Sequence, residues 1–372
     1  MLFSQSNSPE TRNSTSSSSQ RITKSHFWKH LIHRFRMLPR LLKHYRLQKM
    51  LFGFYTAQAI YATTKLGLAD HLNNDAKSCE ELATEMGVDV KVLLHLMYLL
   101  TNLGIVAVDK NGYYKLTSLG SYLRSNSPNS LRGTIISQAD IAAPAWGNLL
   151  YSIKTGNAAF DNTFQMSMYE HLNQNTDANI NFNLWMKETN REVIIPTLEL
   201  CDLSKVKTVV DVGGGTGMLT ALILKKYSNL QAILFDQEHV VSGAGKVLES
   251  ADVADRCQVI GGNFFESVPA GGDLYVISRV IPNWDDTHAL QIIQNCRAAM
   301  APLAKLLIID FVLPNKKMTT FSLLSSLHTL VLNGRLMRTE DEYYDLLSKA
   351  GFQSPQLIKT ISGISLIEAV PG

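Results

Sequence analysis

The sequence contains few cysteines, and their spacing is unlike that of a metal or redox site. Four occur among 372 residues, namely Cys79, Cys201, Cys257 and Cys296. None forms a C-x-x-C pair or has the spacing from histidine that a zinc site requires. Isolated thiols of this kind are typical of a reduced intracellular protein. We therefore expect free cysteines, no bound metal and a cytoplasmic location.

Long apolar runs are also missing. No segment reaches the roughly 20 apolar residues that a membrane-spanning helix needs. The nearest candidate, residues 50–64, is interrupted by Gln58 and several Thr, Tyr and Ala residues. The composition is nevertheless 45% hydrophobic and 18% charged, which supports a large core and excludes a wholly disordered or collagen-like chain. At about 150 residues per domain, the length predicts two or three domains.

Acidic residues are nearly absent from the first 69 positions, which contain eleven Lys and Arg but only Glu10. Residues 1–20 include eight serines and are predicted to be a disordered tail. Residues 21–50 place apolar side chains at three- and four-residue steps between basic ones. This pattern predicts a basic amphipathic helix with a kink or break at Pro39.

Three interpretations of residues 21–50 remain open. The helix could bind the surface of an anionic membrane, or it could belong to a targeting peptide. It could also be an extension that packs on the body of the protein or on a second subunit. The rest of the chain holds 24 basic and 31 acidic residues, so nothing there predicts a nucleic-acid surface.

Residues 51–125 are predicted to form a mainly helical, winged-helix-like module. Ser78 begins a capping box, Asp89 begins a helix that reaches Leu103, and the turn at residues 110–112 separates two short strands. Many such modules bind DNA, but the third helix here has one lysine, Lys91, and an apolar majority. We expect this helix to be buried against a second subunit. Residues 126–200, rich in Trp and Phe without alternation, are predicted to form a helical roof over a pocket.

Residues 201–372 show the alternation of an α/β domain. Short apolar strands are predicted at 208–212, 231–235, 274–278 and 305–311, with helices at 218–227 and 286–300. This order predicts a doubly wound, mostly parallel sheet with helices on both faces.

A glycine-rich turn between the first of these strands and its helix indicates a cofactor site. The turn reads Asp211-Val-Gly213-Gly-Gly215-Thr-Gly217, and its glycines allow a ligand to approach the backbone at a helix N-terminus. Asp236 ends the second strand, where a carboxylate can accept both hydroxyls of a ribose. Asp211 would face a cation and disfavour a pyrophosphate. The two acids together favour S-adenosylmethionine over NAD.

Two further stretches complete a family pattern. They are Gly262-Asn263-Phe264-Phe265 and Ser278-Arg279-Val280, the latter followed by Trp284-Asp285-Asp286. With them, residues 50–370 resemble the S-adenosylmethionine-dependent O-methyltransferases, which include plant caffeate-type and bacterial polyketide-tailoring enzymes. The resemblance implies a Rossmann-like catalytic domain after a winged-helix dimerisation domain, a homodimer and a small-molecule acceptor. It also implies that Asn263 and Phe264 lie near the adenine, and Ser278 and Arg279 beside the sulfonium.

The chain departs from the family at the catalytic base. The family uses the histidine of a Leu-His-Asp-Trp stretch, but this chain has Pro282 there, which cannot accept a proton. Asp310 and Met337 replace two carboxylates that orient that histidine. Asn263 replaces an aspartate, which is a mild change because the amide can still accept a hydrogen bond. Alignment of bound reactants can lower the reaction barrier by about 7–11 kcal/mol, whereas the loss of a base lowers the rate roughly 10²–10⁴-fold. Methyl transfer by proximity alone is therefore physically sufficient for an acidic acceptor.

His328 and Asp310 are the remaining candidates for catalysis. His328 falls in a helix predicted over residues 321–332, although an ordinary core histidine remains an alternative, and His288 is interpreted as a surface residue. The predicted acceptor pocket, for which ordinary packing is the alternative, comprises Trp146, Met168, Met186, Asn283, Trp284 and His328. The predicted function is methyl transfer to a hydroxyl of a small, largely apolar phenolic or polyketide-like metabolite. The alternative is a repurposed hydroxylase, decarboxylase or cyclase that binds S-adenosylmethionine.

Overall fold

The computed structural model describes residues 17–72, 75–194, 199–201, 203–360 and 364–372. It separates into two compact units, residues 1–60 and residues 61–372. Most of the predicted disordered tail, residues 1–16, lies outside the described residues.

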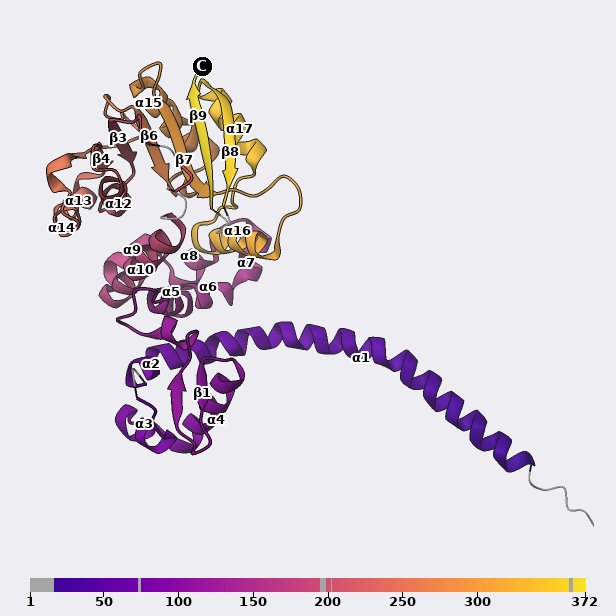
Figure 1. Ribbon diagram of the computed structural model, residues 1–372. Helices are drawn as coiled ribbons and strands as arrows, with labels where there is room; N and C mark the ends of the chain where they lie inside the picture. Colours follow the sequence, from indigo (N-terminus) through magenta and orange to yellow (C-terminus); the bar gives the residue numbers. More distant parts are fainter. Residues whose placement is uncertain (1–16, 73–74, 195–198, 202, 361–363) are drawn as a thin grey trace, which may run out of the picture. The chain divides into compact units, whose positions relative to one another are not determined.

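Helix α1 (Ser17–Lys65) is continuous across the predicted basic extension and beyond it (Figure 1). The helix does not break at Pro39, and residues 17–20 belong to the helix rather than to the tail. A proline removes only its own N–H from the helix ladder, and the other hydrogen bonds continue on both sides. Between residues 41 and 55 this helix exposes many large apolar side chains, among them Leu42, Leu51 and Tyr55. In the part of the chain that is described, no helix is long and apolar enough to cross a membrane.

The first part of the second unit has the predicted order of helices and wing. It contains α2 (Leu68–His71), α3 (Cys79–Met86), α4 (Val90–Asn102), β1 (Val106–Val108) and β2 (Tyr114–Leu116). The capping box at α3 is present, because Ser78 and Glu81 each accept the other's backbone N–H. Asp89 caps α4 by accepting the N–H of Val92, and β1 pairs antiparallel with β2.

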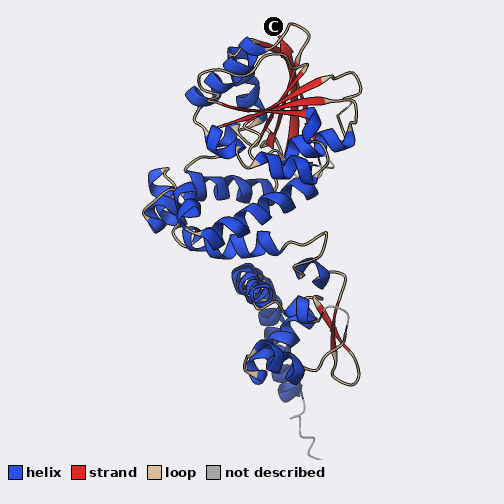
Figure 2. Ribbon diagram, turned by 90° about the vertical axis from the view of Figure 1, so that its left-hand side faces the viewer, coloured by secondary structure: helices blue, strands red, loops and turns tan. Residues whose placement is uncertain are grey.

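The predicted roof is a layer of short helices beside the sheet (Figure 2). These are α5 (Arg132–Ser137), α6 (Ala143–Trp146), α7 (Leu149–Thr155), α8 (Ala159–Phe164), α9 (Met168–Gln174) and α10 (Thr176–Thr189), with π-helical turns at Gln138–Ala142 and Asn190–Ile194. Helix α16 (Thr320–Asn333), much later in the chain, packs among them, and Val331 and Leu332 join Ile141 and Phe160 in one buried cluster.

The sheet has seven strands in the order β5-β4-β3-β6-β7-β9-β8. The parallel strands are β3 (Thr208–Val212), β4 (Gln231–Asp236), β5 (Cys257–Gly261), β6 (Leu274–Ser278) and β7 (Lys305–Phe311). Strands β8 (Phe352–Lys359) and β9 (Ile364–Pro371) form an antiparallel pair at one edge. The four predicted strands are confirmed, whereas β5, β8 and β9 were not predicted.

Helices cover both faces of the sheet (Figure 2), as a doubly wound fold requires. They are α12 (Met218–Lys226), α13 (Glu238–Val241), α14 (Ala244–Ser250), α15 (Asp286–Ala299) and α17 (Glu340–Lys349). Two apolar clusters fill the spaces between sheet and helices, one containing Tyr275 and Tyr343, the other Leu224 and Leu234. Strand β3 lies between β4 and β6, so the chain order reverses there. Ligands of such sheets bind at the carboxyl ends of the strands beside this reversal.

Candidate active site

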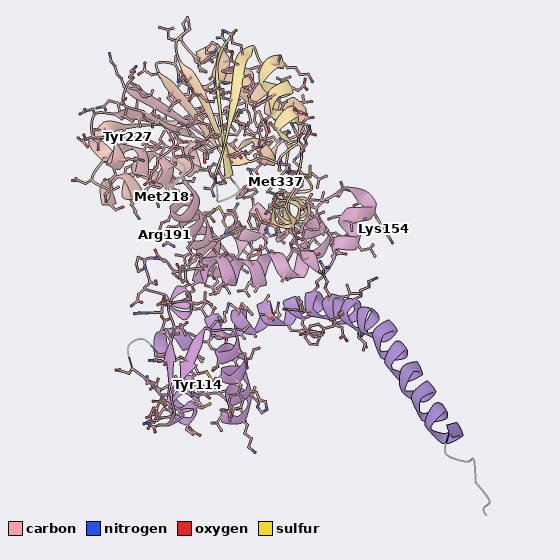
Figure 3. The ribbon with its side chains drawn as sticks, turned by 45° about the vertical axis from the view of Figure 1, so that its right-hand side comes forward. Tyr114, Lys154, Arg191, Met218, Tyr227 and Met337 are labelled. Atoms are coloured by element: carbon pink, nitrogen blue, oxygen red, sulfur yellow. The ribbon has the colours of Figure 1, made fainter. Side chains whose placement is uncertain are left out.

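A cavity of about 1100 Å³ lies where that rule places it. The glycine-rich turn, Asp236 and Ser278 line it from the carboxyl ends of β3, β4 and β6. Side chains of α9, α10 and α16 line it from the helical layer. Met218, at the start of α12, and Met337, beyond the end of α16, both contribute to the wall (Figure 3).

The glycines of the turn serve different purposes. Gly213 has a φ of +72°, and a Cβ there would lie 2.6 Å from Val280. A Cβ at Gly214 would lie 2.7 Å from the Asp211 carboxylate. Gly215 has a φ of +63°, but no atom lies within 4 Å of the position of its Cβ. Close packing therefore requires glycine at positions 213 and 214, whereas the space beside Gly215 is open to the cavity.

Two carboxylates flank this turn. Asp211 is fully buried, and its Oδ2 accepts a 2.6 Å hydrogen bond from Thr220. Its Oδ1 is buried without a hydrogen-bond partner among the described residues. Burial raises the pKa of Asp211 to about 6. Asp236 is partly exposed, and its Oδ2 accepts the N–H of Gly215 at 2.8 Å, so it holds the turn in place.

The end of β6 brings a cation to the cavity. Arg279 has a φ of +56°, which is unusual for a residue with a side chain. Its guanidinium donates to the Asn190 side-chain oxygen and lies 3.7 Å from the Met186 sulfur. Desolvation lowers the pKa of Arg279. Beside it, the Ser278 hydroxyl is buried and has no partner among the described residues.

Asp310, at the end of β7, is the other buried carboxylate of the cavity. It is 1% exposed, and its Oδ2 accepts a 2.9 Å hydrogen bond from the Tyr343 hydroxyl. Its Oδ1 accepts the N–H of Phe311. Burial raises the pKa of Asp310 to about 7, although these hydrogen bonds and the charge of Arg279 oppose the shift.

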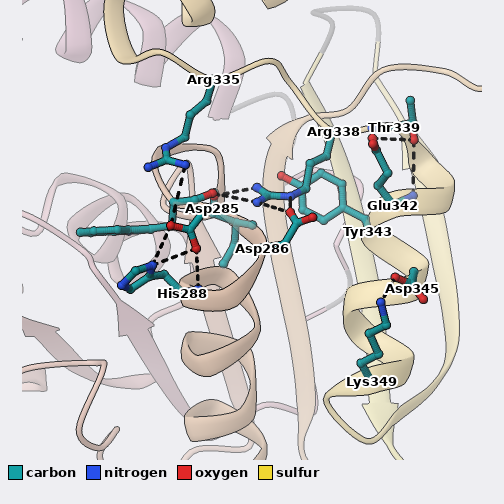
Figure 4. Close-up of polar contacts among 12 residues, drawn as sticks. Asp285, Asp286, His288, Arg335, Arg338, Thr339, Glu342, Tyr343, Asp345 and Lys349 are labelled. Carbon is teal, nitrogen blue, oxygen red and sulfur yellow. Dashed lines mark hydrogen bonds and ion pairs between the residues drawn. The ribbon is translucent and has the colours of Figure 1, made fainter. Parts of the chain in front are cut away.

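Pro282 lines the cavity from a 3₁₀ turn, Ile281–Asn283, that Arg338 holds in place. The Arg338 guanidinium donates to the carbonyls of Ile281 and Trp284, at 2.9 and 2.7 Å, and pairs with Asp286 at 2.8 Å. Asp285 pairs instead with the exposed His288 (Figure 4). This network fixes the backbone of the turn that contains Pro282.

His328 lines the cavity, but its hydrogen bonding does not suit a base. Its Nδ1 accepts the indole N–H of Trp146 at 2.9 Å, and the two rings are stacked. Burial lowers the pKa of His328 to about 4, so the imidazole is neutral near pH 7. A neutral imidazole whose Nδ1 accepts must carry its proton on Nε2. Neither nitrogen then has a free lone pair for the acceptor's proton, so His328 no longer qualifies as the base.

Comparisons with known proteins identify this arrangement. The O-methyltransferase domain matches residues 146–353, and the O-methyltransferase dimerisation domain matches residues 48–126. The chain is 36% identical over 325 residues to the phenazine O-methyltransferase PhzM of Lysobacter antibioticus, covering 87% of this chain and 95% of that one. The chain belongs to the O-methyltransferase family.

Two solved structures show how close the likeness is. The mitomycin 7-O-methyltransferase MmcR superposes with a TM-score of 0.82 at 28% identity, covering 90% of this chain and all of that one. An O-methyltransferase from neocarzinostatin biosynthesis, in complex with S-adenosylmethionine and 2-hydroxy-5-methyl naphthoic acid, gives 0.70 at 26%, covering 85% and 96%. The predicted family, fold and cofactor are confirmed: this O-methyltransferase uses S-adenosylmethionine.

The residues around the turn fit that cofactor. The buried, unpartnered Oδ1 of Asp211 suits a ligand that carries positive charge, because a carboxylate there needs a counter-charge or a donor. The open face of Gly215 leaves room for the ligand beside the backbone. Asp236 retains lone pairs for hydroxyl donors in addition to the N–H of Gly215.

The cavity of the O-methyltransferase brings together most of the predicted site residues. It is lined by Asp211, Gly213, Gly215, Asp236, Ser278 and Arg279 on the cofactor side, and by Trp146, Met168, Met186, Asn283, Asp310 and His328 elsewhere. Gly217, with a φ of +82°, instead caps the start of α12.

Besides Gly217, three predicted residues do not line this cavity. Asn263 uses its side chain within its own turn, accepting from the N–H of Phe265 and donating to Glu266. Phe264 is buried in the core beside the sheet. Trp284 packs edge-on against Phe264 and Phe265 and beside His288, so its predicted role in the acceptor pocket is wrong.

Several cavity residues were not found from the sequence. Asn190, Thr329 and Asn333 lie on the cavity wall. No local motif marks them, since each is one ordinary member of a helix. The contact of Arg338 with the turn of Pro282 spans more than 50 residues of sequence, and only the fold reveals it.

Proposed function

We propose that this enzyme transfers a methyl group from S-adenosylmethionine to a hydroxyl of a small, flat, largely apolar aromatic metabolite. The observation that supports this most strongly is the shared cavity, lined by the cofactor turn on one side and by aromatic side chains on the other. When bound, S-adenosylmethionine supplies an electrophilic methyl group on its sulfonium.

The cofactor is proposed to be held by the residues around the glycine turn. Asp211 would face its positive charge, and Asp236 would accept the ribose hydroxyls. Ser278 would donate its unpartnered hydroxyl near the reactive end. We also propose that Asn263 and Phe264 contact the adenine after small movements of the turn in which they lie.

The acceptor pocket is proposed to lie among α6, α9, α10 and α16. Trp146 and Trp185 flank His328, and Met168 and Met186 add flexible apolar surface. Such walls suit a planar ring system. Relatives named for phenazine, mitomycin and naphthoate substrates agree with this acceptor class.

No base at position 282 is proposed to take part. Pro282 and Asn283 shape the pocket, and the hydrogen bonds from Arg338 hold their turn in a fixed position in the cavity wall. Asp310 remains a proposed participant near the reacting groups. Alignment of acceptor and methyl donor in this enclosed cavity is the main contribution of the chain.

The decisive experiment traces a deuterated methyl group from S-adenosylmethionine into hydroxylated polycyclic aromatics by mass spectrometry. Phenazine, naphthoate and anthraquinone hydroxides would be compared. The expected result is a product heavier by one trideuteromethyl group in place of a hydroxyl proton. The Asp236→Ala variant should lose both the product and cofactor affinity, measured by calorimetry with S-adenosylhomocysteine.

A second candidate function is favoured by Pro282 lining the cavity. The same cofactor could serve a hydroxylase, decarboxylase or cyclase that does not transfer the methyl group. Cofactor binding without a labelled product, together with consumption of an aromatic substrate, would support that function over methyl transfer.

The assembly is proposed to be a homodimer, formed through the dimerisation domain at residues 48–126. We propose a cytoplasmic enzyme that binds no nucleic acid. The role of residues 21–50 is tested by deleting residues 1–49, since the cavity is formed entirely by later residues. We expect unchanged cofactor affinity. Loss of liposome co-sedimentation in the deleted protein would show that this segment binds membrane surfaces, and unchanged sedimentation would exclude it.

A further inference from the structure

Arg279 is a cation in the cavity that forms no ion pair within the part of the chain that the structure describes. No carboxylate among the described residues forms an ion pair with it, and its Nε has no hydrogen-bond partner there. The neighbours that do contact it, Asn190 and Met186, are neutral. A charge removed from water without a partner is costly, so such a group is expected where a ligand supplies the opposite charge.

The charged and titratable groups around Arg279 come from two other elements. Asp310 on β7 attracts its charge from beyond ion-pair distance, and Tyr169 on α9 contributes a phenol. Both oxygens of Asp310 already accept hydrogen bonds, from Tyr343 and Phe311. Asp310 therefore compensates the guanidinium only in part, and positive potential remains in the cavity beside Met186.

The backbone of Arg279 places it next to the position of the missing base. Its carbonyl accepts the side-chain N–H of Asn283, which closes the turn that contains Pro282. Arg279 and Pro282 are three residues apart, and both line the cavity. The left-handed φ of Arg279 is a strained conformation for a residue with a side chain, and strain of this kind is concentrated at functional sites.

We propose that Arg279 is a catalytic residue that binds the acceptor oxygen in its ionised form and so replaces the base missing at position 282. The inference rests on the proposed function, because it assumes a hydroxylated aromatic acceptor. Arg279 removes no proton. It makes the phenolate the favoured bound form of the acceptor.

The reaction balances without a protein base. The hydroxyl proton passes to solvent as the acceptor binds. A lone pair of the anionic oxygen forms the new O–C bond, and the electron pair of the S–C bond stays on sulfur. The positive charge of the methyl donor and the negative charge of the oxygen cancel, while Arg279 keeps its charge throughout.

The test measures ionisation of a bound acceptor, with no turnover required. 1-Hydroxyphenazine, whose visible absorption changes on ionisation, is titrated with pH in the presence of saturating enzyme and S-adenosylhomocysteine. Opposite charges at contact distance shift a pKa by about 1–3 units. We expect the pKa of the bound probe to fall by at least about 1 unit relative to the free probe. An unchanged or raised pKa in the wild-type enzyme would overturn the proposal.

Substitutions at Arg279 and at Asp310 are expected to change the pKa of the bound probe in opposite directions. Arg279→Met removes the charge at similar length, so the pKa of the bound probe should return to at least its free value, while Arg279→Lys should retain part of the decrease. Asp310→Asn removes the competing negative charge, so it should lower the bound pKa further. If Asp310→Asn instead raised it and Arg279→Met did not, Asp310 would be the group that controls ionisation.

The cofactor's own carboxylate is the competing anion for Arg279. If Arg279→Met lowers affinity for S-adenosylhomocysteine more than tenfold but leaves the bound pKa at the wild-type value, Arg279 binds the cofactor and the proposal fails. Loss of probe binding in Arg279→Met at low pH, where the phenol is neutral, would also overturn it. Failure of the wild-type enzyme to bind 1-hydroxyphenazine would contradict only the acceptor class, and 4-nitrophenol would then replace the probe.

Discussion

At the scale of single residues, Asp310 is a carboxyl group whose environment opposes its charge. The folded protein raises its pKa from 3.8 to about 7. Between these values the unfolded chain releases the proton while the folded protein keeps it, so this residue destabilises the fold increasingly as pH rises from about 4 to 7. Each unit corresponds to about 1.4 kcal/mol, so the loss reaches up to about 4 kcal/mol above pH 7.

Asp310→Asn removes this penalty and keeps an acceptor for Tyr343. The stability of the variant relative to the wild type should therefore increase from pH 5 to pH 8. The measurement is the difference between the calorimetric thermal midpoints of variant and wild type, compared at these two pH values. Asp252→Asn, at an exposed carboxylate, is the matched control and should show no such gain. Equal effects of both substitutions would contradict the buried-charge explanation.

Trp146 determines which nitrogen of His328 carries the proton. Two-bond ¹H–¹⁵N spectra of histidine-labelled protein should show His328 as the Nε2–H tautomer, and the signal is assigned by its loss in His328→Asn. In Trp146→Phe the donor is gone, so we expect the Nδ1–H form to become populated and stability to fall by about 1 kcal/mol. A wild-type spectrum with the proton on Nδ1 would restore His328 as a candidate base.

At the scale of elements, different glycines of the turn are needed for folding and for cofactor binding. Gly215→Ala places a methyl group where no protein atom lies within 4 Å, so the variant should fold at a cost of about 1–2 kcal/mol for its left-handed φ. Its affinity for S-adenosylhomocysteine should fall more than tenfold, because the methyl group occupies cavity space. Gly214→Ala meets Leu234 and Asp211 at 2.4 and 2.7 Å and should mainly lower the thermal midpoint. If both variants lost stability equally without a difference in affinity, the turn would not be in contact with the cofactor.

Elements with local signals were predictable, and those built by distant pairing were not. The capping box at Ser78, the turn from β3 to α12 and the strand at Lys305–Phe311 are each determined by a few neighbouring residues. Strand β5 has only an irregular, half-exposed pattern, and β8 contains Pro355, so neither resembles a buried strand. Trp284 was misplaced because its orientation depends on Phe264 and Phe265, which come from a different loop. The partners of His328 and Arg338 were hidden for the same reason.

At the scale of the whole molecule, the exposed apolar face of α4 agrees with the expected dimer. Val92 and Leu99, two turns apart on this helix, are 69% and 38% exposed. We expect light scattering to give a mass near twice the 41.4 kDa of one chain. Val92→Glu combined with Leu99→Glu should shift it to that of a monomer, whereas Val259→Glu, at an exposed residue of β5, should not. A monomeric wild-type protein would contradict the homodimer.

The position of β9 in the sheet has a consequence for biosynthesis. The last strand of the chain, Ile364–Pro371, lies inside the sheet between β7 and β8, and Ile364, Leu366 and Ile367 are fully buried there. While a ribosome still holds these residues, β7 has no neighbour on that side and presents an open edge. The sheet can therefore be completed only after residues 364–371 have left the ribosome. Until then, the nascent enzyme depends on avoiding or shielding contacts between unpaired strands of neighbouring chains.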